Sequence, residues 1–133
     1  MVDDFFGGPV PDSSFSDKKY TPDENLLSAA QTGDRGRFFF SIGNGADVNY
    51  ADPRSGFTAL HYAAAREIRW LINALVKHDN LNYLAKDRKR RLPSTLAFEV
   101  AENPVIGTFL MKREIRMARQ RGIDYRDVLA DEA

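Results

Sequence analysis

Two histidines, His61 and His78, are the side chains best suited to acid–base or metal chemistry in this chain of 133 residues. No cysteine accompanies them and they are well separated in the sequence, so they make a poor metal site. No serine stands in the G-x-S-x-G pattern that exposes a hydrolytic nucleophile. The glycines of Gly43-Asn44-Gly45 are not followed by the Lys and Ser or Thr of a phosphate-binding loop. We therefore expect no enzyme, and no catalytic residue, metal or cofactor.

Basic side chains are densest in residues 86–91, where only Asp87 interrupts a run of lysines and arginines. The basic members are Lys86, Arg88, Lys89, Arg90 and Arg91. Guanidinium groups bind carboxylates through paired hydrogen bonds, which suits recognition of an acidic protein surface. Two other interpretations stay open: a solvated charged loop, and a nuclear-localisation or nucleic-acid patch.

A second basic stripe occupies residues 112–121. Its members are Lys112, Arg113, Arg116, Arg119 and Arg121. The spacing of three between residues 113, 116 and 119 places these arginines on one face of a helix. No aromatic residue is interleaved with the stripe, which disfavours binding of single-stranded nucleic acid. A binder of nucleic acid or another anionic surface, acting through residues 86–91 and 112–121, remains the alternative function.

The composition is that of one globular domain, with 43% hydrophobic residues and 19 basic against 19 acidic side chains. The net charge of zero hides an asymmetry, because residues 1–65 carry a net −4 and residues 66–133 a net +4. The absence of cysteine excludes disulfides and iron–sulfur clusters. Neither a membrane span nor a secretory signal is readable, so we expect a cytoplasmic protein that does not bind membranes.

Local signals predict helices in pairs. Thr21-Pro22-Asp23-Glu24 is a capping box with a proline at the first helical position, and Gly33 can end that helix. A second helix follows through Phe38 and ends at Gly43-Asn44-Gly45. Residues 1–20 lack periodicity and form a flexible tail, which is a disordered end, a segment that docks on the protein itself, or a short motif for a partner.

The same plan recurs twice. Thr58 caps a short helix, and a second helix continues through residues 68–76. Ser94 or Thr95 then caps a helix, and Asn103-Pro104 begins a longer one that ends at Gly122. Asp124 caps a final turn that ends near residue 129. No strand pattern of any length is present, so the fold class is all-α.

The segments Gly45-Ala46-Asp47-Val48-Asn49 and Gly56-Phe57-Thr58-Ala59-Leu60-His61-Tyr62-Ala63-Ala64 resemble the hairpin and the first-helix motif of ankyrin repeats. Leu26, Leu60 and Leu96 recur at spacings of 34 and 36 residues, close to the ankyrin period. The third unit departs from the pattern, because Glu99 stands in place of a small alanine and Leu92-Pro93 in place of the glycine turn. In the second unit, Glu67 replaces the usual glycine.

The resemblance implies a short solenoid of about three repeats with an atypical last repeat that acts as a helical C-terminal cap. We place the domain at residues 21–133, with repeats at about 22–51, 52–85 and 86–121 and a C-terminal turn at 122–133. The bulky side chains Phe38, Phe39, Phe40, Trp70, Leu71, Leu75, Phe98, Phe109 and Leu110 are expected to fill its layers. The resemblance gives His61 a structural role, in which it hydrogen-bonds the backbone within and between repeats.

The resemblance also implies a function, which is non-catalytic binding of a protein partner through the loop tips and the concave helix face. Such a protein acts as an inhibitor, a regulator or a toxin-neutralising partner, and is monomeric when free. The binding residues carried over from the resemblance and from the basic run are Gln31, Thr32, Pro53, Arg54, Phe57, Ala65, Arg66, Arg88, Lys89, Arg90 and Arg91. Phe57 is predicted to anchor the partner, as an aromatic at an exposed turn, and the partner to carry an acidic patch.

Overall fold

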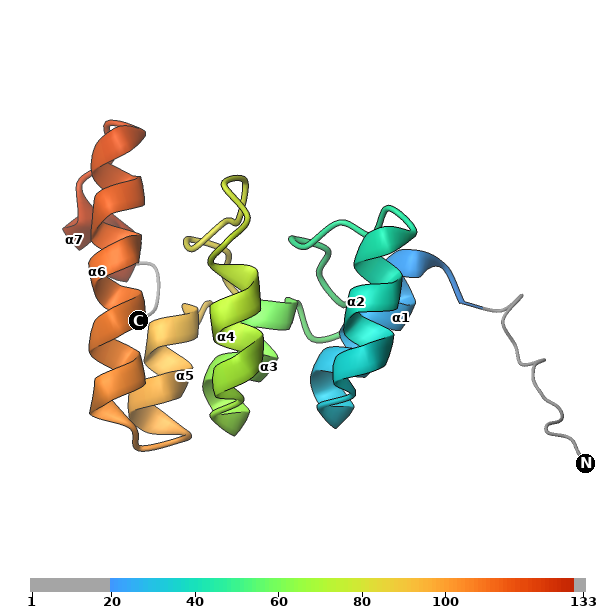
Figure 1. Ribbon diagram of the computed structural model, residues 1–133. Helices are drawn as coiled ribbons and strands as arrows, with labels where there is room; N and C mark the ends of the chain where they lie inside the picture. The colour runs from blue at the N-terminus through green and yellow to red at the C-terminus, as the bar shows by residue number, and fades with distance from the viewer. Residues whose placement is uncertain (1–19, 131–133) are drawn as a thin grey trace, which may run out of the picture.

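The computed structural model describes residues 20–130, so residues 1–19, which make up nearly all of the expected tail, lie outside the described residues. Within the described range the chain forms seven helices and no strand, which confirms the all-α fold class (Figure 1). The helices are α1 (Pro22–Thr32), α2 (Arg35–Gly43), α3 (Ala59–Arg66), α4 (Arg69–Leu75), α5 (Pro93–Glu99), α6 (Pro104–Gln120) and α7 (Tyr125–Ala130).

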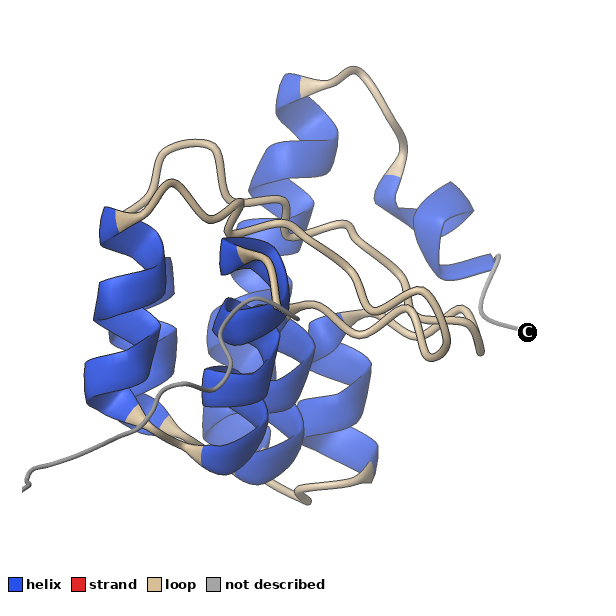
Figure 2. Ribbon diagram, turned by 90° about the vertical axis from the view of Figure 1, so that its right-hand side faces the viewer, coloured by secondary structure: helices blue, strands red, loops and turns tan. Residues whose placement is uncertain are grey.

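The helices stack as pairs. Each of α1, α3 and α5 packs against the helix that follows it, and α1 and α5 both pack against α3. The first helices of the pairs therefore form one row, which we call the inner face, and α2, α4 and α6 form the outer face (Figure 1). The long loops between the pairs project together to one side of the stack (Figure 2). No helix in residues 20–130 has both the length and the apolar character needed to cross a membrane.

The helix ends follow the local signals closely. The Thr21 hydroxyl accepts the Glu24 N–H while the Glu24 carboxylate accepts the Thr21 N–H, and Gly33 ends α1 in the left-handed conformation with φ 77°. Thr58 forms the equivalent capping box with His61 in α3. Glu67 occupies the glycine position after α3 with φ 57°, a conformation that an L-residue adopts only at a cost.

The expected cap of α5 is wrong. The helix begins at Pro93, one residue before Ser94, and neither Ser94 nor Thr95 is its N-cap residue. Instead, the carboxylate of Glu114 in α6 accepts the Ser94 N–H at 3.0 Å and the Ser94 hydroxyl at 2.7 Å. The same carboxylate accepts the hydroxyl of Tyr125 at 2.6 Å. A buried side chain from the next helix thus satisfies the first turn of α5 and connects it to α7.

Small residues let the first helices approach closely. Ala29, Ala30, Ala63 and Ala64 are all fully buried, and Phe38 fills the space beside them. The expectation that every bulky aromatic lies in the core is wrong in four places. Four phenylalanines are more than a third exposed, because they lie on sides of their helices that the core does not cover. They are Phe39, Phe40, Phe98 and Phe109.

Replacing Glu114 with alanine is expected to lower the free energy of unfolding by about 3 kcal/mol, because three donors lose their acceptor in the interior. Thermal or denaturant unfolding measures this. Glu99→Ala, an exposed change on α5, is the control and is expected to stay within about 0.5 kcal/mol of wild type. Equal stability of the two variants would contradict the assigned role of Glu114.

Candidate functional site

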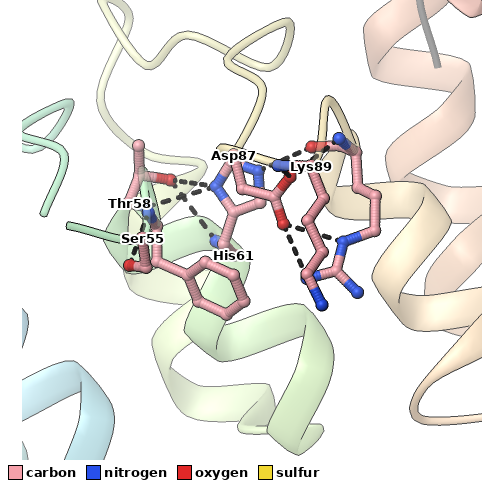
Figure 3. Close-up of polar contacts among 7 residues, drawn as sticks. Ser55, Thr58, His61, Asp87 and Lys89 are labelled. Carbon is pink, nitrogen blue, oxygen red and sulfur yellow. Dashed lines mark hydrogen bonds and ion pairs between the residues drawn. The ribbon is translucent and has the colours of Figure 1, made fainter.

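His61 joins the second helix pair to the loop that leads into the third (Figure 3). Its ring is fully buried, and Nδ1 accepts the Thr58 N–H at 3.2 Å and lies 2.9 Å from the Thr58 hydroxyl oxygen. Nδ1 therefore carries no proton, so Nε2 donates to the carbonyl of Arg91 at 3.0 Å. Burial lowers the pKa of His61 below its ordinary value of 6.5, against the bond to Arg91 and the charge of Asp87. This geometry fits a structural histidine held neutral.

Asp87 shapes the basic loop from within. Its side chain is 1% exposed, and its carboxylate accepts the backbone N–H groups of Lys89 and Arg91 at 2.9 and 2.8 Å. It also forms an ion pair with the Arg91 guanidinium at 2.8 Å. At the start of the loop, Lys86 donates to the carbonyl of Val128 at 2.6 Å. Arg91 is therefore not part of a free cationic surface, and the exposed basic residues of this loop are Arg88, Lys89 and Arg90.

The structure brings two loop tips together that lie more than thirty residues apart in sequence. The N–H of Arg88 donates to the carbonyl of Ser55 at 2.8 Å, and its guanidinium lies 3.3 Å from the carbonyl of Pro53. Gly56 makes this approach feasible, since a Cβ there would lie 2.8 Å from the Arg88 nitrogen. Pro53, Arg54, Arg88 and Lys89 are thus neighbours on one exposed edge, which we call the loop-tip edge.

Phe57 does not stand at an exposed turn, so the premise on which it is predicted to anchor the partner is wrong. It is half-buried and packs against the core. Its ring stacks on His61 at 5.4 Å and meets Tyr62 edge-on at 5.0 Å, and the Arg91 guanidinium lies 5.9 Å from its centre. Phe57 therefore packs between the core and the loop-tip edge and supports this edge from its buried side.

A groove on the inner face runs between α1, α3 and the loop before α3. It contains three of the expected binding residues, Gln31, Pro53 and Arg54. Three tyrosines that the sequence did not single out line it as well, namely Tyr20, Tyr50 and Tyr62. We call this the inner groove. Burial and the nearby Asp52 raise the pKa of Tyr62, which keeps its phenol protonated.

One of these tyrosines, Tyr62, could have been identified from the sequence. Tyr62 stands at the variable position of the Thr58-to-Ala64 motif, where folding imposes no residue type. Thr32 and Arg66, expected at the same surface, are exposed at the far ends of α1 and α3 and do not line the groove. Ala65 is half-buried and does not line it either.

The basic stripe of α6 lies on the other side of the molecule from the inner groove. No aromatic is interleaved within residues 112–121, but the Arg113 guanidinium lies over the ring of Phe109, just before the stripe, at 4.5 Å. Lys112 and Arg116 are exposed beside it. No group of three His, Asp or Glu side chains in residues 20–130 is placed to hold a metal ion.

Residues 37–75 match a family model described as "Ankyrin repeats (many copies)". The match includes α2, α3 and α4 together with the loop that carries Pro53, Arg54 and Phe57. A search of curated proteins found none that matches the chain.

The low pKa of His61 predicts a pH dependence of stability. The unfolded chain binds a proton to this ring near pH 6.5, whereas the folded protein resists it, so stability is full above that pH and falls as the pH decreases. His61→Gln removes this contribution. Chemical denaturation at pH 7.5 and 5.5 should show a smaller stability gap between wild type and variant at the lower pH. A gap that widens on acidification would contradict a neutral buried His61.

Phe57→Ala is expected to lower the free energy of unfolding by about 2 kcal/mol, since the half-buried ring contacts two other rings and a guanidinium. Phe40→Ala removes the same ring from a position that is 70% exposed and is the matched control. Unfolding curves measure both variants. A Phe57→Ala protein as stable as the control would contradict the packing role assigned to Phe57.

Proposed function

Because the chain contains ankyrin repeats over residues 37–75, we propose that it is a non-catalytic module that binds a protein partner on its inner groove and loop-tip edge. Ankyrin repeats in general mediate protein–protein interactions, which supports the coarse statement for this chain. The regulatory role is part of the proposal: the module acts by covering a surface of its partner, as an inhibitor, regulator or toxin-neutralising protein does.

The observation that carries the proposal is the composition of this surface. Tyrosine and arginine dominate binding energy at protein interfaces, because each offers a large flat group with a polar end. The inner groove is lined by Tyr20, Tyr50 and Tyr62, and Arg54 lies at its edge. The loop that carries Pro53 and forms one wall is held by the bonds from Arg88 to Ser55 and Pro53, so little conformational entropy of this loop is lost on binding.

The loop-tip edge supports a partner with an acidic patch. Arg54, Arg88 and Lys89 are exposed there, and Arg90 is exposed next to them in the chain. The structure gives the side chains of Lys89 and Arg90 no partner among the contacts it describes. Exposed charges of one sign accelerate encounter with a surface of the opposite sign, and salt screens this effect. The inner groove itself contains Glu24 and Asp52, so the cations at the edge steer the partner while the tyrosines bind it.

The test begins with affinity capture of partners by the full chain, followed by binding kinetics of the captured protein at two salt concentrations. Tyr62→Ala is expected to weaken binding at least tenfold, mainly through faster dissociation. The double change Lys89→Glu/Arg90→Glu is expected to slow association, and this effect should shrink as salt rises. Lys77→Glu, an exposed charge reversal after α4, is the control for charge.

Wild-type kinetics in both variants would contradict the proposal. Capture of nucleic acid in place of a protein, with an affinity that falls steeply as salt rises, would support the alternative function through residues 86–91 and 112–121.

A further inference from the structure

The outer face carries a second hollow, which the proposed function does not use. It lies between α4 and α6 and continues along the exposed side of α6. Its two halves share Val105 and Phe109, and Ile72 of α4 forms the facing wall. We call this the outer groove. The hollow arises because α4 packs against α3 and α6 packs against α5, whereas α4 and α6 are not packed tightly against each other.

The floor of the outer groove is apolar and open to solvent. Val105 is 69% exposed and Phe109 is 37% exposed, although nothing in a helix start requires a large apolar side chain at these positions. Scattered exposed apolar residues are common, but these two are neighbours that line one hollow. A partner that covered Val105 and Phe109 would remove this surface from water.

The rim of the outer groove carries charge of one sign. Its charged lining residues are Arg69 from α4 and Lys112, Arg113 and Arg116 from α6, and no acidic residue is among those that line it. Glu67 approaches one end through its bond to Asn103 but does not line the groove. The Arg113 guanidinium is held 4.5 Å from the Phe109 ring, which fixes a cation directly beside the apolar floor.

We propose that the outer groove binds an acidic segment of a partner protein whose apolar side chains cover Val105 and Phe109 while its carboxylates meet the four cations. The charge complementarity selects this occupant. A nucleic acid would satisfy the cations and could stack a base on Phe109, but it would leave the aliphatic side chain of Val105 uncovered. A neutral apolar segment would leave the cations without counterions. The groove is independent of the inner groove, because the two are lined by different residues on opposite faces of the helix pairs.

The probe is a labelled amphipathic peptide with Leu and Phe along one helical face and Glu at the remaining positions. Its binding to the full chain is followed by fluorescence anisotropy. Saturable binding is expected, and it should be lost for the same composition in scrambled order and for a peptide with Lys in place of Glu. Phe109→Ala and the double change Lys112→Glu/Arg116→Glu are each expected to weaken binding at least tenfold.

Two control variants match these changes. Arg119→Glu/Arg121→Glu reverses the same number of exposed charges on or directly after α6, beyond the groove, and Phe40→Ala removes an exposed ring on α2. Both should bind the peptide as wild type does. Circular dichroism of every variant establishes that a loss of binding is not a loss of fold.

Several outcomes would overturn the inference. These are equal binding of the ordered and scrambled peptides, equal weakening by the control variants, and preferential binding of a single-stranded oligonucleotide. Self-association of the chain that Phe109→Ala abolishes would assign the groove to a second copy. Tighter peptide binding after deletion of residues 1–19 would assign it to the chain's own N-terminal segment. Arg54→Glu should leave peptide binding unchanged, which separates this test from that of the inner groove.

Discussion

The loop-tip edge depends on one partly buried hydrogen bond, which runs from Nε2 of His61 to the carbonyl of Arg91. That carbonyl also accepts the Asp87 N–H at 3.1 Å, so it closes the basic loop and attaches it to α3 at the same time. Asp87 in turn binds two backbone N–H groups and the Arg91 guanidinium. A protonated or absent imidazole would break this arrangement, because the Thr58 N–H would lose its acceptor as well.

The same network decides which charges face solvent. The five basic residues of the loop predict one cationic patch, yet Asp87 forms an ion pair with Arg91, and Lys86 donates to the carbonyl of Val128 in α7. The basic residues of the loop that remain exposed are Arg88, Lys89 and Arg90. The hydrogen bond between Arg88 and Ser55 positions them beside Pro53 and Arg54. Positive charge on the inner side is thus concentrated at the loop tips, and positive charge on the outer side lies along α6. Each face therefore combines aromatic rings with cations.

Features set by short stretches of chain could be predicted from the sequence. The cap at Thr21, the glycine stop at Gly33, the glycine-like position of Glu67 and the pairing of helices all follow from local patterns and were confirmed. Features that depend on distant residues could not. The N–H and hydroxyl of Ser94 donate to Glu114, twenty residues away in another helix. No local sequence pattern predicts a cap that another helix supplies.

The candidate site shows the same division. Gln31, Pro53 and Arg54 were found because the repeat motif places them, whereas Tyr20 and Tyr50 lie outside any motif and reach the inner groove only through the fold. The burial of Phe57 could not be predicted from its own segment alone, because the Arg91 guanidinium that covers its ring comes from a loop more than thirty residues away.

The central claim is that His61 holds the loop-tip edge in place before any partner arrives. Amide hydrogen exchange of wild type and His61→Gln tests it most directly. The account predicts that the Arg88 N–H, bonded to Ser55, is protected in wild type and exchanges at least tenfold faster in the variant, while the buried amides of Ala29 and Ala30 in α1 keep their protection. Equal exchange at Arg88 in the two proteins would contradict the claim.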